Sequence, residues 1–319
     1  MEQKRVLITG SKGFIGGSVL SKLTSSSEKI LAESHITALV RGSERAKVLQ
    51  SKGISTVLFD SIDSSDQLRT IASDFDGITK LDLTTGTSNL SDQPITGAYK
   101  EDRVFSDTEN IYAYEKMRNG QLSYGQRVTD LTVVETGLKQ DVKTHLIMSG
   151  LIYGRGTGHF NTLTIQVPLL VRAMIASGQA EVVGDGRGIW NHVHIEDVAD
   201  LYEIITARVL AGEDLPSGES GFYFSENGTY TWLELAQGIG HALAKAGKAK
   251  TAEVKSIGLE EAAQTWVGGN KVLAELGFAS NSRTKAERGR GLGWKPKRVD
   301  EDFKRHFEDE VQEILKKAS

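Results

Sequence analysis

The most constraining feature of this sequence is a glycine-rich turn close to its start. Three glycines, each separated by two residues, follow a short apolar run at 6–9 and precede a helical pattern at 16–23. Such a turn lets backbone N–H groups approach a pyrophosphate at the positive end of a helix, although the usual dinucleotide spacing is Gly-x-Gly-x-x-Gly and a plain structural turn is the alternative. Its place in the first strand–helix unit favours nucleotide binding. The predicted cofactor-binding residues of the turn are Gly10, Gly13, Phe14, Ile15 and Gly16.

Beyond the turn, short β-branched runs alternate with helical stretches, which is typical of an α/β protein with a doubly wound parallel sheet. We expect strands near 36–40, 56–59, 81–83 and 145–148, and helices near 44–51, 64–74 and 109–139. Further along, helices near 169–177, 196–210 and 232–246 surround a short strand at 181–183. The sequence therefore predicts an NADP-binding Rossmann domain over 1–150. Residues 151–319 are expected to form mainly a smaller substrate-binding lobe, with some segments returning to the first domain.

Composition narrows the class of partner. The 38 Lys and Arg residues against 42 Asp and Glu residues give a net charge of −4, which offers no basic surface for nucleic acid or an anionic membrane. No apolar run approaches the roughly 18 residues that a membrane span needs. The sequence has no Cys, which excludes thiolate nucleophiles and Cys-ligated metals. We therefore expect a small-molecule substrate and a cytoplasmic protein.

Residues after the second predicted strand favour NADP over NAD. A protein that prefers NAD often places an acid there, bonded to the ribose 2′-hydroxyl. This chain has Arg41, whose guanidinium suits a 2′-phosphate, with Ser43 and Lys47 placed to help. An exposed surface arginine is the alternative. Asp60, after the third strand, either accepts a hydrogen bond from the adenine amine or caps the following turn.

A candidate proton-transfer pair lies in the long helical stretch. Tyr112 and Lys116 are four residues apart and therefore share one helix face. A nearby ammonium favours the phenolate and brings the tyrosine pKa, ordinarily about 10, toward neutral pH. Tyr-x-x-x-Lys is common by chance. Upstream, Thr87 offers a hydroxyl at a strand end, where a turn stabilised by that hydroxyl is the alternative.

Taken together, these motifs resemble the extended short-chain dehydrogenase/reductase family, including its carbonyl-reductase and sugar-nucleotide epimerase branches. The resemblance covers the glycine turn, the set of Thr87, Tyr112 and Lys116, the segment 151–156 and the block 184–199. It implies that Thr87 polarises the substrate oxygen and Tyr112 exchanges the proton. Lys116 would hold the cofactor ribose and lower the tyrosine pKa. Both Tyr112 and Lys116 are thus also expected at the cofactor.

The resemblance also suggests weaker assignments. Ser88, Tyr153 and Trp190 are expected to contact substrate. The family often dimerises through two helices, but one of them is missing from this chain, so a homodimer is one option and the sequence leaves the oligomeric state open. His192 and His194, followed by two acidic residues, could suggest a metal site. The resemblance instead implies that His194 packs or hydrogen-bonds and that the acids at 196 and 197 begin a helix, so we expect no metal.

One departure from the family pattern is severe. Only 23 residues separate Asp60 from Thr84, where the family fits a helix, a fourth strand and another helix. One strand–helix unit is therefore apparently missing after residue 60. Either residues 81–85 occupy the position of the fourth strand, which moves Thr87 by about 4.8 Å, or the sheet has a gap.

The sequence thus predicts an NADP-dependent oxidoreductase that transfers a hydride between nicotinamide and a small carbonyl or alcohol substrate. A sugar-nucleotide epimerase or dehydratase that retains its cofactor is one alternative. A catalytically silent NADP-binding or interaction protein is the other, favoured by the short segment after Asp60.

Overall fold

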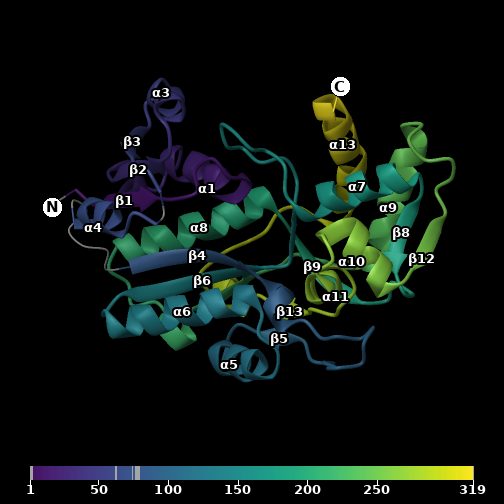
Figure 1. Cartoon of the computed structure of the whole chain (residues 1–319). Helices are drawn as coiled ribbons and strands as arrows, with labels where there is room; N and C mark the ends of the chain where they lie inside the picture. Colours follow the sequence, from purple (N-terminus) through teal and green to yellow (C-terminus); the bar gives the residue numbers. More distant parts are fainter. Residues whose placement is uncertain (1–2, 62, 74, 76–79, 319) are drawn as a thin grey trace.

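The computed structural model describes residues 3–61, 63–73, 75 and 80–318, and Figure 1 shows the chain with its elements labelled. The first residues form a three-stranded parallel sheet in the order β1-β2-β3, as the alternating pattern predicts. Its strands and the helices between them are β1 (Arg5–Ile8), α1 (Phe14–Thr24), α2 (Lys29–Ala32), β2 (His35–Val40), α3 (Ser43–Gln50), β3 (Ser55–Leu58) and α4 (Ser65–Ser73).

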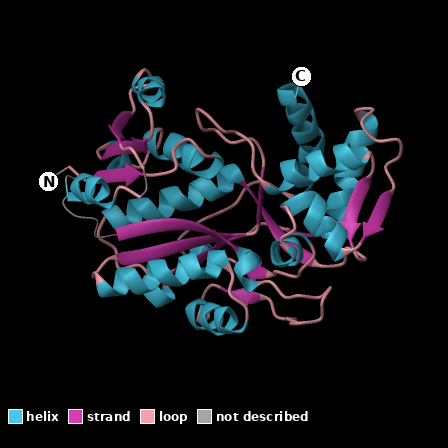
Figure 2. Cartoon of the chain, viewed as in Figure 1, coloured by secondary structure: helices cyan, strands magenta, loops and turns pink. Residues whose placement is uncertain are grey.

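A second parallel sheet has the order β10-β6-β4. Figures 1 and 2 show that α8 lies along one face of the β4 and β6 strands and α6 along the other. The doubly covered α/β architecture predicted from the sequence is therefore confirmed. The elements of this part are β4 (Lys80–Gly86), a 3-10 turn (Thr87–Leu90), β5 (Phe105–Ser106), α5 (Ile111–Gln121), α6 (Gly125–Lys139) and β6 (Lys143–Ser149).

Among the residues that the structure describes, no strand pairing joins the two sheets. β4 pairs directly with β6, in a register that places Leu83 opposite Leu146. Within the described residues, β1 pairs with β2 and has no partner strand on its other side. Of the two arrangements that the short segment after Asp60 allows, the structure has the gap.

The long helical stretch is two helices rather than one. Leu122 and Tyr124 both have extended backbone conformations, which end α5 and precede α6. The side chain of Asn110 caps α5 by accepting a hydrogen bond from the Ala113 N–H at 2.9 Å. This break matters for the site, because it separates the faces presented by residues 111–121 and 125–139.

The second half adds further short strands. The sequence predicts one of them, at 181–183, and the structure has it as β8, whereas the hydrophobic pattern does not reveal the others. They pair as β11-β9-β7, β12-β8 and β13-β5. The elements are β7 (Leu151–Tyr153), α7 (Gln166–Ser177), β8 (Ala180–Val183), β9 (Ile189–His194), α8 (Ile195–Leu210), a 3-10 turn (Gly218–Ser220), β10 (Phe222–Ser225), β11 (Thr229–Thr231), α9 (Trp232–Lys245), β12 (Val254–Ile257), α10 (Leu259–Val267), α11 (Lys271–Phe278), β13 (Thr284–Lys285), α12 (Glu287–Gly291) and α13 (Asp300–Ala318).

Two clusters of buried apolar side chains form the core. One gathers the first sheet, the β4–β6 sheet and later residues such as Leu201 of α8 and Phe224 of β10. The other gathers α7, α9, β8 and the apolar face of α13, including Phe303 and Phe307. Segments of the second half therefore pack against the first sheet and the β4–β6 sheet. No described helix is long and apolar enough to cross a membrane.

Candidate active site

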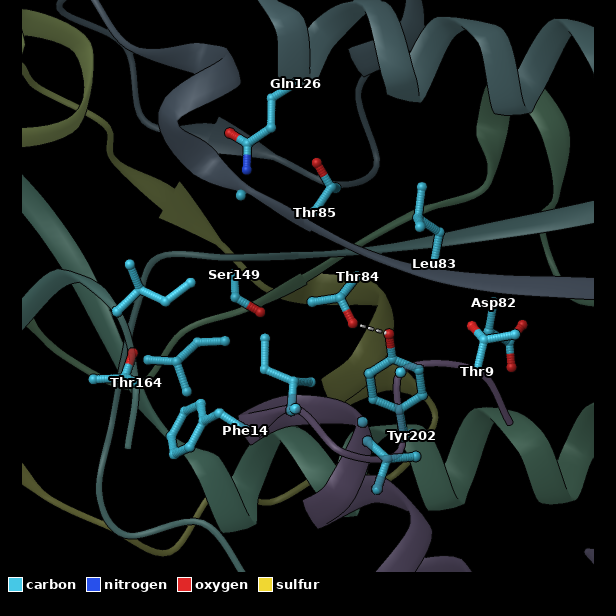
Figure 3. A pocket seen from close by; sticks show the side chains of 18 of the residues that line it. Thr9, Phe14, Asp82, Leu83, Thr84, Thr85, Gln126, Ser149, Thr164 and Tyr202 are labelled. Carbon is cyan, nitrogen blue, oxygen red and sulfur yellow. Dashed lines mark hydrogen bonds between the residues drawn. The ribbon is translucent and has the colours of Figure 1, made fainter. Parts of the chain in front are cut away.

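A cavity of about 960 Å³ lies where the glycine turn meets the carboxyl end of β4. Figure 3 shows side chains from several elements directed into it, among them Phe14 of α1, Thr84 of β4, Gln126 of α6 and Tyr202 of α8. Ligands of parallel α/β sheets bind at the carboxyl ends of the strands, so the position of the cavity is that of a nucleotide site.

The glycine turn has the geometry that an anion needs. Gly10 has a φ of +67°, and a Cβ added to Gly16 would lie 2.5 Å from the Gly10 carbonyl oxygen, so neither position accepts a larger residue without strain. Gly13 precedes α1 without a side-chain cap, which leaves the first N–H groups of the helix available to a ligand. These groups and the helix dipole suit a phosphate.

A loop after β7 closes over this turn. Its Thr157 N–H donates to the Ser18 hydroxyl at 3.1 Å, and its Asn161 N–H donates to the Lys12 carbonyl oxygen at 3.2 Å. Gly158 approaches Gly17 closely: a Cβ added to Gly17 would lie 3.2 Å from the Cα of Gly158. Asn161 and Thr164 of this stretch line the cavity, so the loop forms part of its wall.

Ser88 and Tyr124 form a hydroxyl pair in the same cavity. The Tyr124 hydroxyl donates to the Ser88 hydroxyl at 3.1 Å, and Ser88 in turn donates to the side-chain carbonyl of Gln126. All three residues line the cavity. Thr87 lines it too and is fully buried, and within the described part of the chain its hydroxyl has no hydrogen-bond partner. A buried hydroxyl of this kind favours a polar ligand group nearby.

The environment of Tyr124 controls its acidity. Burial raises the pKa of Tyr124 above its ordinary value of 10.0, while the hydrogen bond with Ser88 and the positive charge of Arg127 act in the opposite direction. The Arg127 guanidinium carbon lies 5.5 Å from the centre of the Tyr124 ring. Four residues after Tyr124, the chain has Val128 rather than a lysine. Tyr124 therefore remains protonated at neutral pH, and its hydroxyl carries a proton that it can donate in a hydrogen bond.

The expected pair of Tyr112 and Lys116 is brought together, but not at the cavity. The Lys116 ammonium donates to the Tyr112 hydroxyl at 3.0 Å, and that hydroxyl donates to Glu135 at 2.9 Å. Lys116 and Glu135 also form an ion pair at 3.2 Å, with more than half of each side chain exposed. Among the described residues, neither Tyr112 nor Lys116 lines the cavity, whereas Thr87 does. On the two sides of the break between α5 and α6 the tyrosines have different partners: Tyr112 bonds to Glu135 of α6, whereas Tyr124 bonds to Ser88 in the 3-10 turn after β4.

The residues expected at a 2′-phosphate lie on the surface after β2. Arg41 is exposed and its guanidinium carbon lies 5.9 Å from the centre of the Phe59 ring. Ser43 begins α3, and the Lys47 ammonium pairs with Glu44 at 2.8 Å. The backbone N–H of Asp60 donates to the side chain of Gln67 at 2.9 Å. In the described structure these four residues lie outside the cavity lining.

Of the three residues weakly assigned to substrate, two line the cavity and one lies outside its lining. Ser88 and Trp190 line the cavity, although Trp190 is almost fully buried and its ring N–H donates to Ser280 at 3.1 Å. Tyr153 lies outside this lining, in an aromatic cluster where its ring centre is 5.4 Å from that of His192. His194 caps α8 by accepting a hydrogen bond from the Glu196 N–H at 3.2 Å.

Sequence reasoning missed Tyr124 and Gln126. A search for a lysine four residues after a tyrosine selects Tyr112 and passes over Tyr124, because Val128 stands at the lysine position. The signal that could have found Tyr124 is its place just before the helix that leads directly into β6. Gln126 carries no motif, and only its contact with Ser88 identifies it.

Behind the cavity, Asp130 holds a buried polar network. It accepts hydrogen bonds from the Thr85 hydroxyl and the Asn89 amide, both at 2.7 Å. Burial raises the pKa of Asp130 to about 6. Burial and the neighbouring charge of Asp130 also raise the pKa of Glu115, which is fully buried.

This network predicts a pH-dependent stability. Because the folded pKa of Asp130 lies above its unfolded value of 3.8, the free energy of unfolding falls as pH rises from about 4 to 6. A single carboxyl contributes at most about 1.4 kcal/mol per pH unit. Asp130→Asn keeps an acceptor for Thr85 and Asn89 and is expected to flatten this slope. Urea unfolding at several pH values measures it, and a slope unchanged by the substitution would contradict the assignment.

Comparisons with known proteins support the fold. No protein-family model matches the chain. It is 26% identical to Oxidase ucsJ of Acremonium sp, over 92% of this chain and 93% of that protein, and 24% identical to an uncharacterized protein of Saccharomyces cerevisiae, over 92% and 95%. The first alignment runs over 335 positions, more than the 319 residues of this chain, so Oxidase ucsJ carries segments that this chain lacks.

Solved structures match nearly the whole chain. The PbgP3 protein of Burkholderia pseudomallei superimposes with a TM-score of 0.61 at 14% identity, over 99% of this chain and 98% of that one. The dTDP-glucose 4,6-dehydratase of Bacillus anthracis, solved in complex with NAD, superimposes with a TM-score of 0.61 at 13% identity, over 98% and 97%. The resemblance that the sequence motifs indicate is confirmed for the architecture: this chain has the fold of the extended short-chain dehydrogenase/reductases.

Proposed function

We propose that this chain is an NADP-dependent oxidoreductase acting on a small carbonyl or alcohol substrate. The observation that carries the proposal is that one cavity is lined by both the glycine turn and the Ser88–Tyr124 pair. The similarity to Oxidase ucsJ and the NAD complexes among the matching structures support a nicotinamide cofactor. The choice of NADP rests on Arg41.

The residues present fit such a cofactor. The glycine turn and the first N–H groups of α1 would hold its pyrophosphate, and Arg41 and Ser43 would hold a 2′-phosphate. The nicotinamide would supply or accept the hydride when bound. Phe14, which is buried and lines the cavity, excludes water from this region.

Tyr124 is the proton-transfer residue of the proposed reaction. In carbonyl reduction its hydroxyl gives a proton to the substrate oxygen while the carbonyl carbon takes the hydride, and the reverse holds for alcohol oxidation. Ser88 lies 3.1 Å from the Tyr124 hydroxyl and positions a second hydroxyl for the same oxygen. The proposal thus moves the proton-transfer role from Tyr112 to Tyr124 and leaves Thr87 beside the substrate.

The preference for NADP is tested at Arg41. We expect NADPH to bind more tightly than NADH, and Arg41→Ala to remove most of the difference, because a charged hydrogen bond contributes about 1.5–3 kcal/mol. Calorimetric titration with both cofactors measures the two affinities. Lys52→Ala, at an exposed lysine after α3, is the matched control and should leave the preference intact. Equal affinities for both cofactors in the unaltered chain would refute the assignment.

Two other functions are separated by simple measurements. An epimerase or dehydratase is supported by matching structures such as the UDP-glucose 4-epimerase of Thermotoga maritima, solved with UDP-glucose. Oxidised cofactor that survives purification of this chain would favour it. A catalytically silent NADP-binding protein is favoured by Val128 and by the gap in the sheet. Cofactor binding without turnover on a panel of aldehydes and ketones would favour that function.

We also propose a division of roles between the two halves of the chain. Residues 1–150 bind the cofactor and the second half supplies most of the substrate pocket. A homodimer through α5 and α6 is consistent with the exposed apolar side chains of Met117, Val128 and Leu138 on these helices. Sedimentation measures that state, and fractionation measures the predicted cytoplasmic location.

A further inference from the structure

The gap between the two sheets is a slot with a strand on each side. Arg5–Ile8 of β1 and residues 82–86 of β4 line the same cavity, which continues from the glycine turn to the start of β1. Both strands end at this cavity, β1 at the turn that begins with Gly10 and β4 at Thr87, so they run in the same direction. Within the described ranges, β1 pairs with β2 and β4 pairs with β6, and neither pairs with the other.

The strand backbones present hydrogen-bonding groups to the slot. In a parallel sheet, alternate residues bond to opposite neighbours. The bond from the His35 N–H to the Lys4 carbonyl assigns Lys4 to the β2 side, so the N–H and C=O of Leu7 face the slot. The bond from the Leu146 N–H to the Gly221 carbonyl assigns Leu146 to β10. By the same alternation, Asp82 and Thr84 of β4 direct their backbone groups into the slot.

The walls of the slot are largely apolar. Val19 and Leu23 of α1 and Leu210 of α8 line one side, and Leu83 of β4 also lines it. Polar residues interrupt these walls: Arg5, Asp82 and Thr206 line the cavity, and Figure 3 shows the Thr84 hydroxyl meeting the Tyr202 hydroxyl of α8. Val6, Leu7 and Leu83 are only partly buried, although the inner strands of a doubly covered sheet are normally fully buried. A strand in the slot would complete their burial.

We propose that this slot is a docking site for an extended peptide segment of a partner polypeptide, which enters as a parallel strand between β1 and β4. The unpaired backbone groups on both sides specify a strand rather than a helix or a small apolar molecule. β1 spans four residues and β4 spans seven, so the paired part of the segment is at most seven residues long. Because helices cover both faces, the segment carries apolar side chains on both faces.

Hydrogen exchange tests the proposal directly. The probe is an acetylated and amidated peptide with the core Val-Ala-Val-Val-Val-Ala-Val, flanked by two lysines at each end for solubility. We expect saturable one-to-one binding to the full chain, a higher melting temperature, and exchange at the Leu7 and Thr84 amides slowed by about tenfold or more, because free amides exchange faster than paired ones. NADPH affinity of the chain alone, measured separately, tests the proposed function and is independent of this result.

Two controls isolate the backbone pairing. The same peptide N-methylated at alternate residues keeps its side chains but loses donors, and it should neither bind nor protect. Leu210→Trp fills the slot and should abolish binding, whereas Val104→Trp, at an exposed site just before β5, should not. Failure of the unmodified peptide to bind would overturn the proposal. Equal binding of the N-methylated peptide would also overturn it, because the slot would then be a site for apolar groups of any kind.

Discussion

Inserting a strand–helix segment ahead of β4 is expected to raise the melting temperature of this chain by about 5–10 °C. Across the described part of the chain, the present gap leaves backbone groups of Leu7, Asp82 and Thr84 without strand partners. An unpaired buried group costs about 1–3 kcal/mol, and each kcal/mol moves the melting temperature of a chain of this size class by roughly 2–4 °C. Because these strands are only half-buried, we expect a gain in melting temperature near the lower end of the range that these costs give.

The matched control carries a Gly/Ser segment of the same length in the exposed turn at Lys248, between α9 and β12. That insertion adds chain without adding strand pairs, so it should leave the melting temperature unchanged or lower it. Calorimetry of the three chains, with and without NADPH, measures the effect. A native chain that already unfolds cooperatively at the temperature of the completed one would show that the gap is tolerated, and the silent-protein alternative would lose its main support.

Tyr124→Phe is expected to lower turnover of a reducible aldehyde or ketone by roughly 10²- to 10⁴-fold, the loss typical of a general acid–base group. The phenyl ring keeps the packing, and the hydroxyl that donates to Ser88 is removed. NADPH affinity should stay nearly unchanged, because the expected phosphate contacts belong to the glycine turn and Arg41. Steady-state kinetics and calorimetric titration separate the two quantities.

The control for this substitution is Tyr112→Phe. Tyr112 is buried, donates to Glu135 of α6 and lies outside the cavity lining, so removal of its hydroxyl should leave turnover within about twofold of the unaltered chain. The opposite outcome, a large loss for Tyr112→Phe and none for Tyr124→Phe, would restore the assignment based on the Tyr-x-x-x-Lys spacing.

Local sequence patterns predicted much of the fold. The alternation of short apolar runs with helical stretches located the strands at 35–40, 55–58 and 143–149 within a few residues. This succeeds because the periodicity of a strand or a helix depends only on residues close together in the sequence. The glycine turn was equally readable, since the positive φ of Gly10 and the close approach at Gly16 require glycine whatever surrounds them. The short segment after Asp60 revealed in advance that a strand–helix unit was missing.

Other features depended on contacts that no local pattern records. The second half forms strands of two to six residues whose partners lie far away in sequence, as β10 does with β6. The break at Leu122 and Tyr124 divides the predicted helix into two. As a result Tyr124 lines the cavity, whereas the sequence predicted Tyr112 there. A Tyr-x-x-x-Lys spacing places both side chains on one face of a helix, but it does not specify what that face meets.

The α/β class, the nucleotide-type turn and the length deficit can be read from the amino-acid sequence, because each follows from spacing along the chain. The pairing of β4 with β6, the open edge of β1 and the cavity that Ser88, Tyr124 and Gln126 share with the turn follow from three-dimensional packing. Those outcomes depend on which surfaces can be buried together and which backbone groups find partners, and these are properties of the whole packed chain.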